Sequence, residues 1–190
     1  MKRTLFFLFL LATLWGPGEN LTAQESTAPS ASHLPRLTTC TDKNLGFQIK
    51  CSPHWQREIS PESLMLVVKG RPRHIVTVTI TKFAQGQYLW EDLSPKNLQA
   101  NFHYEPDFKI GPSRVGGQKA VIVIANPIHY PNVQILDYFV IKNKALYRIS
   151  FSVNTRNRFE EYKDLFAVLI RSFTFTEPSS TSLSRVDAQE

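Results

Sequence analysis

The sequence predicts an α+β fold: an α/β/α sandwich around a central antiparallel β-sheet, with a long C-terminal helix packed across it. Three observations predict this architecture. Residues 74–83 alternate apolar side chains with threonines, the period of a strand with one face in the core. Residues 133–143 are apolar on both faces, which favours a central strand covered on each side. Large apolar side chains recur every three or four residues within 155–173, as in an amphipathic helix: Phe159, Tyr162, Phe166, Leu169 and Phe173.

The other elements follow from the same periodicities and from turn signals. A short helix is expected between residues 89 and 104, because Ser94 can cap it and Pro95 suits its first position. Gly116-Gly117 and residues 142–144 are typical of turns between strands. We expect one sheet to contain all of the strands. Besides 74–83 and 133–143, these are predicted at 37–42, 47–51, 63–70, 108–115, 119–126, 145–153 and, as a short closing strand, 174–176.

The two ends of the chain differ from the middle. Lys2 and Arg3, an apolar run over 5–15 and a small residue at Ala23 predict a signal peptide over 1–23, with an uncleaved anchor as the alternative. Residues 24–36 are rich in Ser, Ala and Pro and predict a flexible linker, and 177–190 predict a disordered tail. One domain remains, at 37–176. The expected location is therefore periplasmic or secreted.

The two cysteines, Cys40 and Cys51, lie in the first two predicted strands. If the turn is centred between Leu45 and Gly46, the two residues face each other directly, and an exported protein can then form a disulfide between them. Two free buried thiols are the alternative. A redox-active pair would lack the C-x-x-C spacing that lowers a thiol pKa.

The sequence has no recognisable catalytic apparatus. It contains no G-x-S-x-G elbow, no H-E-x-x-H pair and no glycine-rich phosphate loop. The best metal candidate is the triplet His103, Glu105 and Asp107, which fits an exposed loop equally well. Asp137, in an apolar strand, is expected to face outward or to be hydrogen-bonded. We therefore expect no enzyme activity, no cofactor and no metal.

The formal net charge of +6 is modest, and the basic residues are scattered. Export argues against a nucleic-acid partner, whereas the charge is compatible with weak association with a membrane surface. Loops often carry binding residues, and the candidate contacts are Trp55, Arg71, Arg73, Tyr88 and Trp90. For Trp55 the alternative is an aromatic plug over one end of the core.

The order of several short motifs resembles the PsbP-like family. The motifs are Gly46-Phe47 followed by Pro53-His54-Trp55, the turn Gly116-Gly117-Gln118-Lys119-Ala120, the strand pair around KNKALYRISFSV, and the helix pattern Phe159, Tyr162, Phe166, Ser172, Phe173. That family includes a photosystem II subunit, a small Ran-binding protein of eukaryotes and many exported bacterial proteins. The resemblance covers most of residues 38–176. It implies the sandwich fold and a binding or assembly role.

The residues and the resemblance together predict an exported, non-catalytic protein that binds an unidentified protein partner in the cell envelope. One rival is a small-molecule or lipid carrier. It requires an apolar cavity with a volume on the order of several hundred Å³ and few polar groups. The other rival is a hydrolase or metal enzyme with a dispersed site. It requires His103, Glu105, His129 or Asp137 to converge in one pocket.

Overall fold

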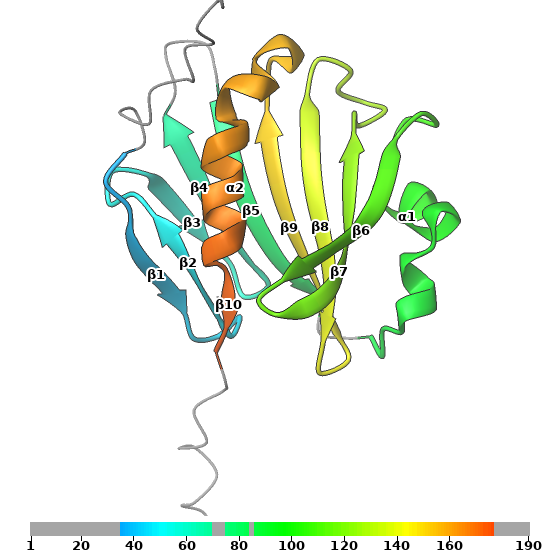
Figure 1. Cartoon of the computed structure of the whole chain (residues 1–190), viewed down its shortest axis with the longest axis horizontal. Helices are drawn as coiled ribbons and strands as arrows, with labels where there is room; N and C mark the ends of the chain where they lie inside the picture. Colours follow the sequence, from blue (N-terminus) through cyan, green and yellow to red (C-terminus); the bar gives the residue numbers. More distant parts are fainter. Residues whose placement is uncertain (1–34, 70–74, 84–85, 177–190) are drawn as a thin grey trace, which may run out of the picture. The chain divides into compact units, whose positions relative to one another are not determined.

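The computed structural model describes residues 35–69, 75–83 and 86–176 (Figure 1). The predicted signal peptide, the tail, most of the linker, and both Arg71 and Arg73 lie outside these residues. Among the described residues, no helix has the length and apolar character needed to cross a membrane.

A seven-stranded antiparallel sheet forms the centre of the domain, in the order β3-β4-β5-β9-β8-β7-β6. The prediction placed most of these strands to within two residues, but it missed β3, whose four side chains are all exposed and show no apolar alternation. The strands are β3 (Gln56–Ile59), β4 (Ser63–Lys69), β5 (Ile75–Phe83), β6 (Lys109–Val115), β7 (Gln118–Ala125), β8 (Gln134–Lys142) and β9 (Ala145–Val153).

The expectation of a single sheet is wrong, because a second sheet of three strands covers part of the first. Its order is β1 (Thr38–Asp42), β2 (Phe47–Cys51) and β10 (Thr174–Phe175). The final strand turns back after the C-terminal helix and pairs with β2, with Phe175 opposite Phe47. The N-terminal hairpin therefore finds its partner in the last strand rather than in the large sheet.

The Cys40–Cys51 disulfide is present, and its Cα atoms lie 5.8 Å apart. The register is shifted from the predicted one, since Cys40 lies opposite Ile49 rather than opposite Cys51. The Asp42 carboxylate accepts the backbone N–H of Leu45 at 2.9 Å and so holds the turn nearer the first strand. The two cysteines are diagonal neighbours on one face, which still allows the bond.

Two helical regions cover opposite faces of the large sheet, so the predicted sandwich is confirmed. The first comprises the 3₁₀ turn η2 (Trp90–Leu93) and α1 (Pro95–Phe102). As predicted, the Ser94 hydroxyl caps α1 by accepting the backbone N–H of Asn97, at 3.4 Å. The second comprises the 3₁₀ helix η3 (Arg156–Tyr162) followed by α2 (Lys163–Ser172).

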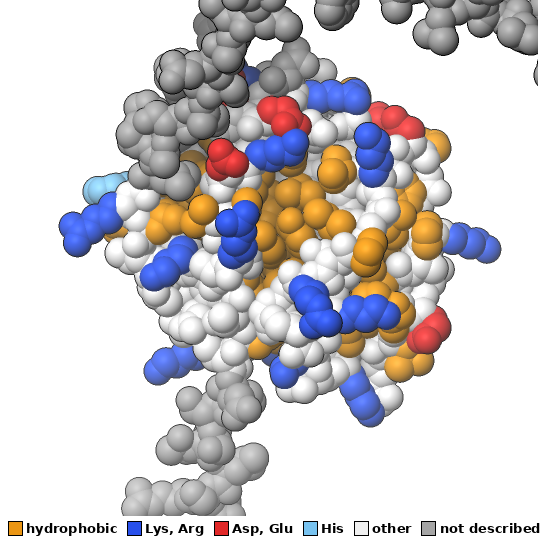
Figure 2. Space-filling view, in the orientation of Figure 1, with side chains coloured by type: hydrophobic (Ala, Val, Ile, Leu, Met, Phe, Trp, Pro, Cys, Tyr) orange, Lys and Arg blue, Asp and Glu red, His pale blue; other side chains and the backbone are white. Residues whose placement is uncertain are grey.

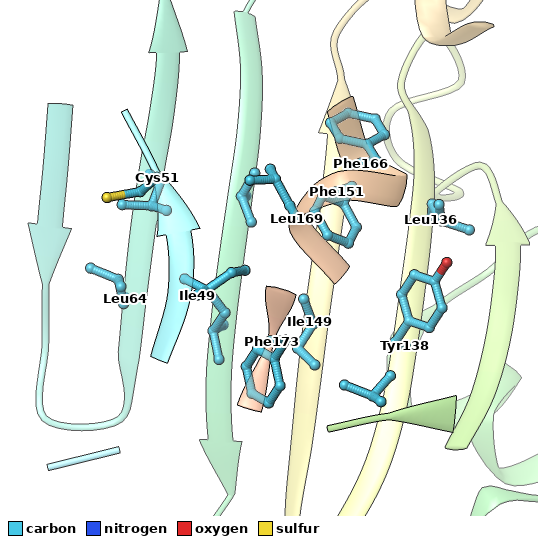
Figure 3. Packing of buried hydrophobic residues seen from close by; sticks show 14 of the residues in the cluster. Ile49, Cys51, Leu64, Leu136, Tyr138, Ile149, Phe151, Phe166, Leu169 and Phe173 are labelled. Atoms are coloured by element: carbon cyan, nitrogen blue, oxygen red, sulfur yellow. The ribbon is translucent and has the colours of Figure 1, made fainter. Parts of the chain in front are cut away.

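The predicted C-terminal helix is thus present in two windings. Its first half is 3₁₀, and only the last ten residues are α-helical. The tighter winding still brings Phe159 against Phe166, with ring centroids 5.6 Å apart. The apolar stripe read from the sequence therefore reaches the sheet, where Phe166 also packs on Phe151 of β9 at 4.8 Å (Figure 3).

Each face of the large sheet has its own apolar core. One lies beneath α2 and the small sheet, and the other beneath α1. As the sequence predicted, β8 contributes to both: Leu136, Tyr138 and Val140 to the first, Ile135 and Phe139 to the second.

Candidate functional site: a groove between α2 and β6

The small sheet and α2 cover only part of one face of the large sheet (Figure 1), and the uncovered part between α2 and the edge strand β6, called the groove here, is hollowed in the space-filling view (Figure 2). At the end of the sheet where β6 begins, the groove deepens into a cavity of about 290 Å³. The cavity is lined by residues of β6, β7 and β8, of the residues just beside these strands, and of η3 and α2. Figure 2 shows a hollowed hydrophobic area on this face, with Lys and Arg side chains around its border and Asp and Glu side chains among them at the upper side.

The floor of the groove is apolar. Side chains alternate between faces along a strand, so Ile122 and Ile124 of β7 lie on the same face as Leu136 and Tyr138 of β8. The two isoleucines are only partly buried, and Leu136 and Tyr138 keep 8% of their surface exposed. Ile122 and Ile124 are thus incompletely covered by the domain itself, whereas Leu136 and Tyr138 are buried beneath this floor.

Tyr138 adds a polar group to this floor. Its ring lies edge-on to Phe151, with centroids 6.1 Å apart, and its hydroxyl points along the sheet (Figure 3). That hydroxyl forms no hydrogen bond with any residue that the structure describes. Burial raises the pKa of the Tyr138 phenol, so at neutral pH it offers an O–H donor to a bound group.

One wall of the groove is a face of α2. Lys163 lines the cavity, and Ala167 and Ile170 follow it at helical spacings of four and three on the same face. Ala167 and Ile170 are half-buried. The opposite side of the helix faces the small sheet, where the Ser172 hydroxyl accepts the backbone N–H of Lys50 at 2.9 Å.

The β6–β7 hairpin closes the other end of the groove. Its turn residue Gly116 has φ +54°, and a Cβ there would meet the Phe175 ring at 2.9 Å. The hairpin turn thus packs directly against β10, and this approach leaves no room for a side chain. Only glycine combines the positive φ with this contact without strain.

Charges border the cavity. Lys163 contributes a cation that is paired with Glu160 at 2.6 Å. Lys109 and Arg156 also line the cavity, and neither forms an ion pair within the described part of the chain. Asp107 is the acidic residue of the lining that has no such pair. The unpaired charges therefore favour a group that carries a carboxylate or another anion.

The three predicted contact residues that the structure describes lie away from this groove. Trp55 is only 8% exposed and belongs to the core under α2, so it presents little surface to a partner. Tyr88 and Trp90 are half-buried against the other core. Lys119 Nζ lies 3.8 Å from the centroid of the Trp90 ring, which leaves this face of the indole in contact with a cation of the same chain.

Asp137 is fully buried and belongs to a polar cluster under α1. Its Oδ2 accepts hydrogen bonds from Arg148 and from the Tyr104 hydroxyl, whereas its Oδ1 has no partner in the described structure. Burial and the charge of Asp137 raise the pKa of Tyr104. For Arg148, burial would lower the pKa, but the attraction of Asp137 outweighs it and the pKa is raised.

The residues that a dispersed enzyme site requires do not converge on Asp137. His103 and His129 are exposed neighbours, with ring centroids 6.3 Å apart, and Glu105 accepts a hydrogen bond from the Asn126 amide at 3.2 Å. Asp137 is held by Arg148 and Tyr104 instead. Within the described residues, no three His, Cys, Asp or Glu side chains form a group that could hold a metal ion.

Sequence reasoning missed the groove. The pattern of β7 and β8 shows that both faces of these strands are apolar. It cannot show that α2 leaves part of one face uncovered next to β6. Lys109, Arg156 and Lys163 come together only in the fold. A weak signal was present, because Gly111 in the β6 edge strand leaves its inner face without a side chain opposite Ile122.

The fold resembles that of two solved proteins of the PsbP-like type. The structure of cyanobacterial PsbP (CyanoP) from Synechocystis sp. PCC 6803 matches with a TM-score of 0.51 at 13% identity, over 78% of this chain and 97% of that one. The Ran-binding protein Mog1p of Saccharomyces cerevisiae matches with a TM-score of 0.52 at 10% identity, over 77% and 98%. No protein-family model matches the chain, and no curated protein matches its sequence. The chain therefore has a PsbP-like fold, as its motifs suggested.

Proposed function

We propose that this chain is an exported, non-catalytic binding protein of the cell envelope, and that the groove between α2 and β6 binds a segment of a partner protein. The observation that carries the proposal is the apolar floor of the groove, where Ile122 and Ile124 are only partly buried. Such surface inside a concave site is typical of a binding site. The fold supports the proposal only in part, since one protein with this fold is a Ran-binding protein.

The charge of the border selects the kind of segment. Lys109 and Arg156 have no acidic partner within the described residues, and they sit where the cavity opens from the apolar floor. A segment with apolar side chains followed by a carboxylate would satisfy both parts of the site. We therefore propose that the partner segment is apolar and acidic.

The walls argue against a lipid carrier. Seven of the eleven residues that line the cavity are charged or carry an amide: Asp107, Lys109, Asn126, Gln134, Arg156, Glu160 and Lys163. A carrier for an apolar small molecule would need a closed cavity with few polar groups. A protein segment, which brings its own polar backbone, fits this mixed lining better.

The test selects peptides from a displayed library of random 12-residue sequences against the purified full chain and measures their affinity by titration calorimetry. We expect enriched peptides that combine apolar residues with Asp or Glu. Ala167→Phe places a larger side chain on the α2 wall, where it fills part of the groove, and should abolish binding of these peptides. Arg171→Gln, on the exposed outer side of α2, is the matched control and should leave binding unchanged.

The charge of the site is tested in the same assay. Lys109→Glu and Arg156→Glu should each weaken binding of the acidic peptides, whereas Lys43→Glu in the distant β1–β2 turn makes the same charge change and should not. If no motif is enriched, or if Ala167→Phe binds the selected peptides as tightly as the parent chain does, the groove is not the binding site.

A further inference from the structure

The end of the sheet where the groove opens presents large apolar side chains to solvent. Six large hydrophobic residues in the described structure are strongly exposed, and Ile75, Ile128 and Tyr130 are three of them, at 55%, 51% and 65%. Val76 and Gln134 are both level with Val153 in the sheet. Ile75, at the start of β5, and the β7–β8 loop therefore lie at the same end.

The β7–β8 loop presents Ile128 and Tyr130 on a fixed backbone. The N–H of Ile128 donates to the carbonyl of His103 at 3.0 Å, and the N–H of Tyr130 donates to that of Pro127 at 2.9 Å. Two further hydrogen bonds, from Val133 to Tyr130 and from Arg156 to Asn132, fix the rest of the loop at 2.9 and 2.8 Å. The exposure of these side chains is thus a property of the ordered fold.

Unpaired cations accompany the apolar loop. Arg156 is joined to the loop by its backbone hydrogen bond, and Lys109 begins β6 at the same end. Glu160 pairs with Lys163 and Glu161 pairs with Arg158 at 3.6 Å, whereas Glu105 accepts a hydrogen bond from the neutral Asn126 amide and keeps its charge. Asp107 is the carboxylate of the cavity lining that remains unpaired.

The chain enters the described domain at this end. β1 starts there, near the end of β4, whereas β10 leaves the domain at the opposite end (Figure 1). The residues that precede the domain include the apolar run at 5–15. If that run is retained as an anchor, it joins the domain through the end that carries Ile128 and Tyr130.

We propose that this end of the domain docks on an anionic membrane surface, with Ile128 and Tyr130 inserted among the lipid headgroups. Aromatic residues such as tyrosine favour the membrane–water interface, and basic residues near an anionic leaflet strengthen attachment. The apolar loop and the unpaired Arg156 and Lys109 supply both contributions. The groove then opens close to the bilayer surface.

The test reports how deeply the side chain at position 130 enters the bilayer. It therefore works whether or not the apolar run at residues 5–15 is retained. Tyr130→Trp is mixed with vesicles of phosphatidylcholine and phosphatidylglycerol that contain brominated phosphatidylcholine, and the fluorescence of the parent chain is subtracted. The introduced indole should be quenched by the bromines. Ile59→Trp is the matched control at the opposite end of the sheet, where Ile59 is 69% exposed, and it should not be quenched.

Charge provides the second arm. Quenching should increase with the fraction of phosphatidylglycerol and decrease with salt, because the attraction is screened. Arg156→Gln in the Tyr130→Trp chain should lower partitioning about fivefold, as expected for one basic residue near an anionic surface. Lys43→Gln removes a charge at the far end and should have no effect.

Three results would overturn the proposal: an introduced indole at position 130 that stays unquenched, equal quenching at position 59, or quenching that ignores phosphatidylglycerol. Ala167→Phe separates this proposal from that of the groove. It should abolish peptide binding and leave vesicle quenching intact. If Tyr130→Trp instead loses peptide binding and shows no quenching, the loop contacts protein and not lipid.

Discussion

Arg148 donates two hydrogen bonds, from Nε at 3.0 Å and Nη2 at 2.8 Å, to the same carboxylate oxygen of the buried Asp137. The Arg148 guanidinium also lies over the Phe102 ring, 4.8 Å from its centroid. This pair joins β8, β9 and α1 at one point. The strand residue Asp137 is thus held by partners from its own chain.

The two members of this pair should respond differently to substitution. Asp137 is fully buried, whereas 26% of the Arg148 side chain is exposed. Arg148→Met removes the cationic partner of the buried Asp137 carboxylate, which water cannot reach. The free energy of unfolding should therefore fall by about 3–5 kcal/mol. Asp137→Asn leaves an arginine that can still reach solvent and should cost less. Urea unfolding followed by circular dichroism measures both, and equal losses would contradict this account.

Replacing both members should recover stability. In Asp137→Leu/Arg148→Met, no charge remains buried, so the loss should be smaller than for Arg148→Met alone. A double variant that is less stable than Arg148→Met alone would show that the pair does more than neutralise charge.

The disulfide should stabilise the small sheet. Cys40→Ala/Cys51→Ala removes a covalent ring with a sequence separation of 11 residues and should lower the free energy of unfolding by about 3 kcal/mol. Reducing agent should lower the stability of the parent chain by a similar amount and leave the variant unchanged. If the reductant shifts both midpoints equally, the effect does not come from this bond.

The turn glycines provide a matched pair of substitutions. Both Gly116 and Gly117 have positive φ, +54° and +78°, but only at Gly116 would a Cβ meet the Phe175 ring. Gly117→Ala should cost about 1 kcal/mol from backbone strain alone. Gly116→Ala should cost clearly more, because the hairpin must also move away from β10. Thermal unfolding of the two variants decides the comparison, and equal costs would mean that the contact is unimportant.

Tyrosine ionisation should lower stability at alkaline pH. Burial raises the pKa of both Tyr104 and Tyr138 above the ordinary value of about 10. The folded state therefore holds protons that the unfolded chain has lost, so this stabilisation is complete below about pH 10 and is lost as the pH rises further. Absorbance at 295 nm should show late-titrating phenols, and Tyr138→Phe should remove one of them. A phenol at position 138 that titrates with the exposed tyrosines would contradict its burial.

The periodicity of the sequence was enough to predict the large sheet, because alternation in β5 and β9 and the two-faced β8 report burial directly. It predicted the helical stripe for the same reason. It could not predict the 3₁₀ winding of η3 or the pairing of β10 with β2, because these depend on contacts between residues far apart in the chain. β3 carries no apolar face at all, so no pattern marked it.

The candidate site was less predictable than the fold. Trp55 attracted attention as a large aromatic after a strand, yet its size also makes it a good core residue, and the core is where it lies. The groove depends on how far α2 stands from β6, which no local pattern encodes. Arg156 and Lys109 are unremarkable in sequence, and they matter only because they border the same cavity.

The pairing of β10 with β2 has a consequence for how the chain reaches its native state. Phe175 must come to lie opposite Phe47, so the hairpin that carries both cysteines keeps an unprotected edge until almost the whole domain has emerged. A chain that emerges N-terminus first would therefore complete the small sheet last, although the small sheet contains its first two strands. Shielding of that edge during folding should therefore limit aggregation, since an open strand edge invites pairing with other chains.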